Sequence, residues 1–265
     1  MNPLTPLHRI FFALVGLFAI WVAVWGLFLP AAIGWAIPWQ VPPLHARFIG
    51  AVYLAGAVMM GWALIARHLA EVQVAVIMAA IWTGMLLLVS LFHLGEFNYG
   101  EWPAYFWFGA YIAYPLMGAW LAYTYRPTPL PETSAAVPDW ARTLLVAVGV
   151  ICIALAACLF FAPAWMASIW PWGISVLLAH IYSGPFLSFG VGSLLLARRR
   201  YWIELRIVLV SMAVFGTVVL VASLIHAGLF APIGPAAVLW FGGFALGTAL
   251  VAFLSFQSLR PAGNS

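Results

Sequence analysis

Apolar segments alternate with short polar turns along almost the whole chain. Each segment is close to the roughly 20 residues that a helix needs to cross the hydrocarbon layer of a bilayer. The pattern predicts eight transmembrane helices, at about residues 10–29, 46–66, 71–93, 104–125, 141–162, 174–197, 203–226 and 236–258. The predicted fold class is therefore an all-α integral membrane protein.

Residue types that are rare in this chain recur at an interval of 133 residues, since 226 − 93 = 133 for the histidines His93 and His226. Chance seldom aligns proline, arginine, glutamate and tryptophan at one interval, so this regularity indicates a tandem duplication. The same interval separates Pro38 from Pro171, Arg67 from Arg200, Glu71 from Glu204, and Trp107 from Trp240.

The duplication predicts two four-helix repeats, at residues 1–126 and 140–265, joined by a proline-rich cytoplasmic linker at residues 127–139. Each repeat has an even number of spans, so the two are expected to be parallel and related by an axis along the membrane normal. Every arginine except Arg47 falls on one side of this topology. The positive-inside rule then predicts a multi-pass protein of the cell membrane, a bacterial inner membrane, with both termini cytoplasmic.

Composition supports this class and excludes several kinds of chemistry. Hydrophobic residues make up 66% of the 265 residues and charged residues only 6%, far below the quarter that is usual in soluble domains. The chain has no lysine, which rules out a Schiff-base lysine and a phosphate-binding loop for ATP. Neither ATP nor nucleic acid is an expected partner. The expected partners are the lipid bilayer and the subunits of a larger membrane complex.

Histidines are the most interesting candidates for a site. His93 and His226 end the third helix of each repeat on the predicted outer side. A neutral imidazole can ligate haem iron or another transition metal, and it can also carry a proton. Ser90 and Ser223 lie three residues earlier on the same helix face, where they are expected to orient the rings. The structural alternative is a helix-terminal histidine that bonds a carbonyl group.

His45 and His180 begin the second helix of each repeat on the same predicted side. Their separation is 180 − 45 = 135, so they do not align under the repeat. A haem held by two histidines would pair His45 with His93, or His180 with His226, between adjacent helices. The chain contains no Cys-x-x-Cys-His motif, so covalent haem attachment is excluded.

Arg47 departs from the positive-inside pattern. It is expected to form an ion pair with Glu96 or Glu101 of the next outer loop, or to hold an anionic head group. The outer connections at residues 29–43 and 162–172 are apolar, aromatic and too short to span. They are expected to lie along the membrane surface, where they would cover a cavity near the histidines or seal the bundle.

The segment Arg47-Phe48-x-Gly50-x-x-Tyr53-Leu54-x-Gly56 opens the second helix of the first repeat. A first helix that ends near proline, an outer loop and this motif resemble the DoxX-like group of small four-helix membrane proteins. The resemblance covers one repeat at a time, and the second repeat lacks the arginine. It implies a quinone or redox neighbourhood and assigns no catalytic residue.

Three functions fit these features. The first is binding of a small apolar ligand or cofactor, a quinone, lipid or haem, near the outer face. The second is a structural or accessory subunit of a larger complex, for which the short loops and low charge are suited. The third is a small-molecule transporter, since parallel repeats occur in transporters. The sequence does not decide whether the chain is an enzyme.

Overall fold

The computed structural model describes residues 3–39, 41–126 and 135–260, and this part of the chain is folded into helices. The long helices are separated by single turns and short 3₁₀ segments. Their bounds are α1 Pro6–Phe28, α2 Pro43–Ile65, α3 Leu69–Phe92, α4 Trp102–Thr124, α5 Asp139–Phe161, α7 Val176–Ala197, α8 Arg206–Ile225 and α9 Pro235–Leu259. The short elements are η1 Pro30–Trp35, η2 Leu94–Glu96, α6 Pro163–Ile169, η3 Trp202–Glu204 and η4 Ala227–Phe230.

In the described residues, seven helices are long and apolar enough to cross a membrane: α1, α2, α3, α5, α7, α8 and α9. The prediction of a multi-pass helical membrane protein is confirmed at this level. The remaining long helix, α4, also has 23 residues, but it contains Pro103 and Pro115 and many tyrosines and tryptophans in place of aliphatic residues. These residues lower its hydropathy, so composition alone does not identify α4 as a span.

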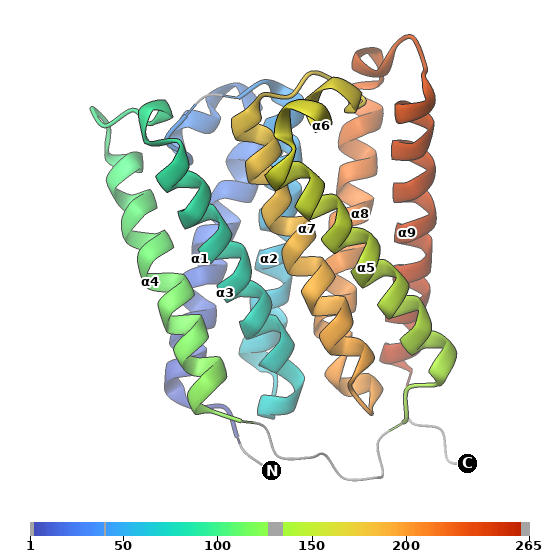
Figure 1. Ribbon diagram of the computed structural model, residues 1–265. Coiled ribbons are helices and arrows are strands. Elements are labelled where there is room, and N and C mark those ends of the chain that lie inside the picture. Colours follow the sequence, from blue (N-terminus) through green and yellow to red (C-terminus); the bar gives the residue numbers. More distant parts are fainter. Residues whose placement is uncertain (1–2, 40, 127–134, 261–265) are drawn as a thin grey trace.

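The long helices run roughly along one direction, with the start of α1 and the end of α9 at the same end of the bundle (Figure 1). The short segments η1 and α6 lie at the opposite end, which we call the α6 end (Figure 1). The two apolar connections that were expected to lie along the membrane surface thus contain a 3₁₀ helix and a short α-helix, each begun by a proline, Pro30 and Pro163. Proline suits the first turn of a helix because that turn needs no backbone donor.

The main helix contacts come in pairs that correspond under the 133-residue interval. Helix α1 packs on α2 and α5 on α7, while α3 packs on α4 and α8 on α9. Across the two halves, α2 packs on α8 and α3 packs on α7. The core is therefore shared between the halves, because the central helices α2, α3, α7 and α8 bury more surface than the flanking helices α5 and α9.

Most of the linker, residues 127–134, lies outside the described residues, as does the C-terminal tail at residues 261–265. The last part of the linker is bonded to the turn before α8. The amide of Val137 donates to the carbonyl of Arg200 at 2.9 Å, and the amide of Trp202 donates to that of Ala135 at 3.0 Å. This contact ties the start of the second half to its own third helix.

Candidate functional site

The histidines gather at the α6 end, and most of them bond to one another or to neighbouring helices. The residue His93 caps α3, and its Nε2 lies 2.8 Å from Nδ1 of His180 on α7. The other nitrogen of His180 lies 3.1 Å from the carbonyl oxygen of Phe160 on α5. A carbonyl only accepts, so Nε2 of His180 carries the proton and its Nδ1, in the neutral ring, accepts from His93. Both nitrogens of His180 are thus used in joining three helices.

A second contact lies at the equivalent place in the other half. His226 caps α8, and the guanidinium of Arg47 on α2 donates to its Nε2 at 2.5 Å. Because 180 − 47 = 133, Arg47 and His180 are at corresponding positions. Each reaches across to the histidine that caps the third helix of the other half. The shared role of this position is to join α2 to α8 and α7 to α3.

His45 makes a third contact between the halves. Its ring is buried, with Nδ1 at 2.6 Å from the hydroxyl of Tyr182 on α7 and Nε2 at 3.1 Å from the carbonyl oxygen of Gly173. The carbonyl fixes the proton on Nε2, so Nδ1 accepts from the tyrosine. The structure therefore does not bring His45 to His93, nor His180 to His226.

The histidine geometry does not fit a haem iron held by two axial rings. An imidazole nitrogen binds a transition metal at about 2 Å, so two opposed nitrogens would be about 4 Å apart. Those of His93 and His180 are in direct contact at 2.8 Å. In the described residues, no group of three or more histidine, cysteine, aspartate or glutamate side chains is placed to hold a metal ion. In this structure each of the four histidines bonds to a residue of another helix or loop.

The two serines bond to tryptophans. The hydroxyl of Ser90 accepts from Nε1 of Trp107 at 2.8 Å, and that of Ser223 accepts from Nε1 of Trp240 at 2.9 Å. These two bonds join α3 to α4 and α8 to α9, and they are related by the same 133-residue interval. The serines therefore orient the tryptophans, where we had expected them to orient the histidines.

The acidic residues expected near Arg47 lie elsewhere. Glu101 accepts from the side-chain amide of Asn98 at 3.0 Å within its own loop, and Glu96 is exposed in η2. None of the three ion pairs found in the described residues includes Arg47. Burial, and next the neighbouring Arg47 guanidinium, lower the pKa of His226 below its usual value. The arginine thus helps to keep this ring neutral.

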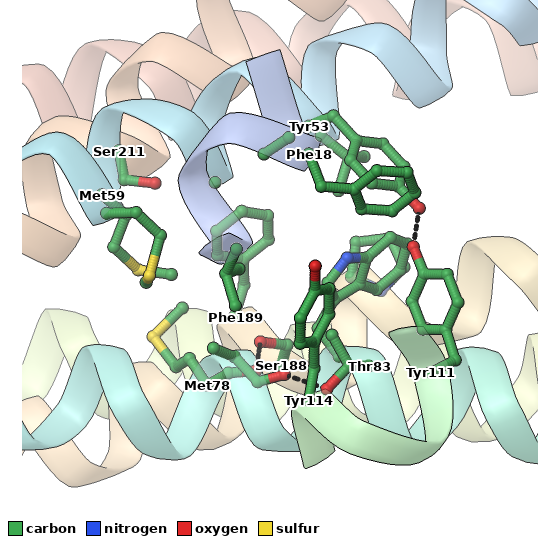
Figure 2. A pocket seen from close by; sticks show the side chains of 18 residues that line it. Phe18, Tyr53, Met59, Met78, Thr83, Tyr111, Tyr114, Ser188, Phe189 and Ser211 are labelled. Atoms are coloured by element: carbon green, nitrogen blue, oxygen red, sulfur yellow. Dashed lines mark hydrogen bonds between the residues drawn. The ribbon is translucent and has the colours of Figure 1, made fainter. Parts of the chain in front are cut away.

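A small buried cavity lies in the middle of the bundle, between the first four long helices and the central helices α7 and α8 (Figure 2). Its volume is about 50 Å³, which is room for a few water molecules. The hydroxyls of Tyr53 and Tyr111 bond to each other at one side, and the Tyr114 hydroxyl points into the space (Figure 2). The hydroxyls of Ser188 and Ser211 bond to carbonyls of Met78 and Ala55. The polar wall is therefore largely satisfied by the protein itself.

A much larger space lies in the second half, a groove of about 1060 Å³ lined by α5, α6, α7, α8, η4 and α9. Pockets that bind small molecules usually measure about 300–1000 Å³. Near the start of α5 and the end of α9, Trp140 and Phe253 contact each other, with ring centroids 5.9 Å apart. Elsewhere α5 and α9 stay apart, whereas α1 and α4 of the first half pack on each other.

Side-chain size contributes to the difference between the two halves. The first half fills this space with Trp82, Thr83, Tyr111 and Tyr114, all of which line the small cavity. The residues 133 positions later are smaller, and all of them line the groove. They are Phe215, Gly216, Phe244 and Gly247. The 133-residue interval contained this signal, and sequence reasoning had missed it in favour of the histidines.

Comparison of the chain with protein-family models, with curated proteins and with solved structures finds no match in any of the three.

Proposed function

We propose that this chain is an eight-span membrane protein of two parallel four-helix repeats, and that it binds an apolar molecule of the lipid or quinone class in the groove between α5 and α9. The proposed orientation has both termini in the cytoplasm, because Arg47 is the only described arginine at the α6 end. In this scheme α4 is the eighth span, since its 23 residues reach about 35 Å. Kinship with the DoxX-like proteins remains part of the proposal.

The paired contacts support the repeat arrangement. The bonds from Trp107 to Ser90 and from Trp240 to Ser223 are related by 133 residues, as are those at Glu71 and Glu204 before the third helices. The same interval relates α2 to α7 and α3 to α8, so the contact of α2 with α8 corresponds to the contact of α7 with α3. A twofold axis along the bundle predicts such an exchange.

The observation that carries the binding function is the groove itself. The second half has Gly247 where the first half has Tyr114, and nothing lies within 4 Å of a Cβ built at Gly247. The apolar atoms that line an open groove gain contacts when an apolar molecule lies in it. A groove of this size on a bundle in lipid is therefore expected to be filled by an apolar molecule.

Gly247→Tyr tests this proposal, because it restores the tyrosine found at Tyr114 in the first half. Nothing lies within 4 Å of a Cβ built at Gly247, so the new ring can enter the groove without disturbing the backbone. The matched control is Gly242→Tyr, on the same helix, also with nothing within 4 Å and outside the groove lining. Native mass spectrometry of the protein in mild detergent would measure the co-purified lipids and quinones.

We expect the parent and Gly242→Tyr to retain an apolar molecule at near one per chain. In Gly247→Tyr the affinity for this molecule should fall about tenfold, which corresponds to about 1.4 kcal/mol of binding free energy. Equal retention by both variants, or a parent protein that carries no such molecule, would show that the groove is not a binding site. Thermal unfolding of both variants checks that they are folded.

A further inference from the structure

We infer that Arg47 binds a phosphate group at the α6 end of the bundle, through the Nε and Nη2 atoms of its guanidinium. Arg47 is not among the residues that line the groove between α5 and α9. The inference therefore goes beyond the proposed function and does not depend on it.

The positive charge of Arg47 has no counter-ion in the part of the chain that the structure describes. Its side chain is half-buried where α2 meets α8, and none of the ion pairs found in the described residues includes it. At the opposite end of the bundle, by contrast, Arg206 pairs with Glu71, and Arg199 pairs with Glu204. A half-buried cation has lost part of its hydration, and a bound anion would compensate for that loss.

The hydrogen-bond partner that Arg47 has among the described residues is neutral. A guanidinium has only donors, so Nε2 of His226 accepts, and the imidazole carries no charge while this bond exists. The bond uses one N–H group of Nη1 and leaves the Nε and Nη2 edge unused. His226 therefore positions the arginine without reducing its charge.

The remaining donors of Arg47 are open to the surface. Nε and Nη2 bond to no acceptor in the described residues, and neither atom is enclosed. The Nε atoms of Arg142 and Arg206 differ, because both are enclosed by the protein. The two parallel N–H groups on one edge of a guanidinium match two oxygens of a phosphate. An incoming phosphate can therefore reach this edge of Arg47 and accept from both donors.

The corresponding position in the other half shows that joining the helices does not need an arginine. His180 occupies this position, and it joins α7 to α3 through Nδ1, which lies 2.8 Å from Nε2 of His93. Its Nε2 donates to the carbonyl oxygen of Phe160, so both ring nitrogens are used within the protein. A charged side chain with unused donors is present at this place in the first half alone. The joining role thus does not explain the charge of Arg47, whereas binding of an anion accounts for it.

The depth of Arg47 favours a phosphate. It is the fifth residue of α2, about 6 Å from the start of the helix at 1.5 Å per residue. A long arginine side chain near the end of a span extends toward the head-group layer, where lipid phosphates lie. Arg47 is also the only described arginine at this end, and the chain has no lysine. Among the described residues, a phosphate at the α6 end therefore has this one arginine to bind.

The test measures binding of three probes to the delipidated full chain in an uncharged detergent at pH 8. Dioleoylphosphatidylglycerol has a lipid phosphate, dioleoylglycerol has the same tails without a phosphate, and inorganic phosphate has no tail. Native mass spectrometry measures binding of the two lipids, and isothermal titration calorimetry measures binding of inorganic phosphate. We expect the parent chain to bind dioleoylphosphatidylglycerol about tenfold more tightly than dioleoylglycerol, because only the former brings a phosphate to Arg47.

Two variants remove the charge of Arg47. Arg47→His introduces the residue that the other half has at this position, so the joining role should be kept, and Arg47→Gln introduces an uncharged amide. Both variants should lose the preference for the phosphate-bearing lipid. Arg67→Gln, which changes an exposed arginine at the opposite end, should keep this preference. Unfolding temperatures without probes check that the three variants are folded.

Each outcome decides the inference. A preference for dioleoylphosphatidylglycerol that is lost in both Arg47 variants supports a lipid head group as the ligand. Binding of inorganic phosphate that depends on Arg47, without a preference between the two lipids, supports a free phosphate as the ligand. If binding of no probe depends on Arg47, the inference is wrong and the arginine only joins α2 to α8. An equal loss of the preference in Arg67→Gln would also contradict it, because the effect would then come from the net charge of the chain.

Discussion

Nε2 of His93 donates a hydrogen bond of 2.8 Å to Nδ1 of His180, and this bond joins α3 of one half to α7 of the other. At the equivalent place Arg47 donates to His226. A His–His pair and an Arg–His pair, related by the 133-residue interval, thus perform the same joining role.

Acid should destabilise the Arg47–His226 contact. The pKa of His226 is lowered in the folded protein, by burial first and by Arg47 second. Because the pKa of His226 is lower in the folded protein, the unfolded chain binds the proton more readily. The free energy of unfolding is therefore highest above the ordinary pKa of 6.5, and it decreases as the pH falls through the folded pKa. Arg47→Gln should reduce this loss, because it removes the neighbouring charge.

The measurement is the unfolding temperature in detergent between pH 8 and pH 5 for the parent and Arg47→Gln. Arg67→Gln, at the opposite end of the bundle, serves as the control and should keep the parent's dependence. An unchanged slope in Arg47→Gln would contradict the assigned electrostatic effect.

Ser90→Ala and Ser223→Ala should destabilise the protein equally. Each change leaves a buried indole N–H, of Trp107 or Trp240, without its acceptor. The expected cost is about 1–3 kcal/mol for each variant. Unfolding measurements in detergent would compare the two. A loss in only one of them would indicate that the bonds are not equivalent and would weaken the repeat proposal.

Glu71→Gln should destabilise the protein more than Glu204→Gln. The Glu71 carboxylate is 1% exposed, accepts from the amide of His68 at 3.0 Å and pairs with Arg206 of the other half. Glu204 is 10% exposed and lies 3.6 Å from Arg199 of its own half. We expect a loss of about 3 kcal/mol for Glu71→Gln and about 1 kcal/mol for Glu204→Gln. Denaturant titration of the two variants would measure both, and equal losses would contradict the prediction.

Gly26→Ala should disrupt the packing of α1 on α2. A Cβ built at Gly26 lies 2.6 Å from the carbonyl oxygen of Ala46 and 2.8 Å from the Cα of Gly50, and neither backbone can move freely. We expect a loss of at least about 2 kcal/mol. Gly109→Ala is the control, since nothing lies within 4 Å of its Cβ. A thermal unfolding series should show a large decrease for the first variant and none for the second.

Much of the fold follows from the sequence. The predicted segments at residues 46–66 and 174–197 agree with α2 and α7 to within three residues, because an apolar stretch in lipid has to satisfy its own backbone as a helix. The start of α8 also differs by three residues. The segment was expected to begin at residue 203, but Trp202–Glu204 forms a 3₁₀ turn and the helix starts at Arg206.

The candidate site was less accessible from the sequence. The histidines drew attention because polar side chains in an apolar chain are costly. Which partner each would take depended on how α2, α3, α7 and α8 cross, and no local pattern contains that information. His45 thus bonds to Tyr182 and His180 to His93, in pairs that sequence reasoning had not considered.

The sequence by itself determined the helical segments, the 133-residue interval and the gathering of arginine at one end, because these depend on hydropathy and residue type along the chain. Only the tertiary structure decided that the halves share one core and that a groove opens between α5 and α9. The physical reason is that a missing side chain, as at Gly247, leaves a space only where no distant neighbour closes over it.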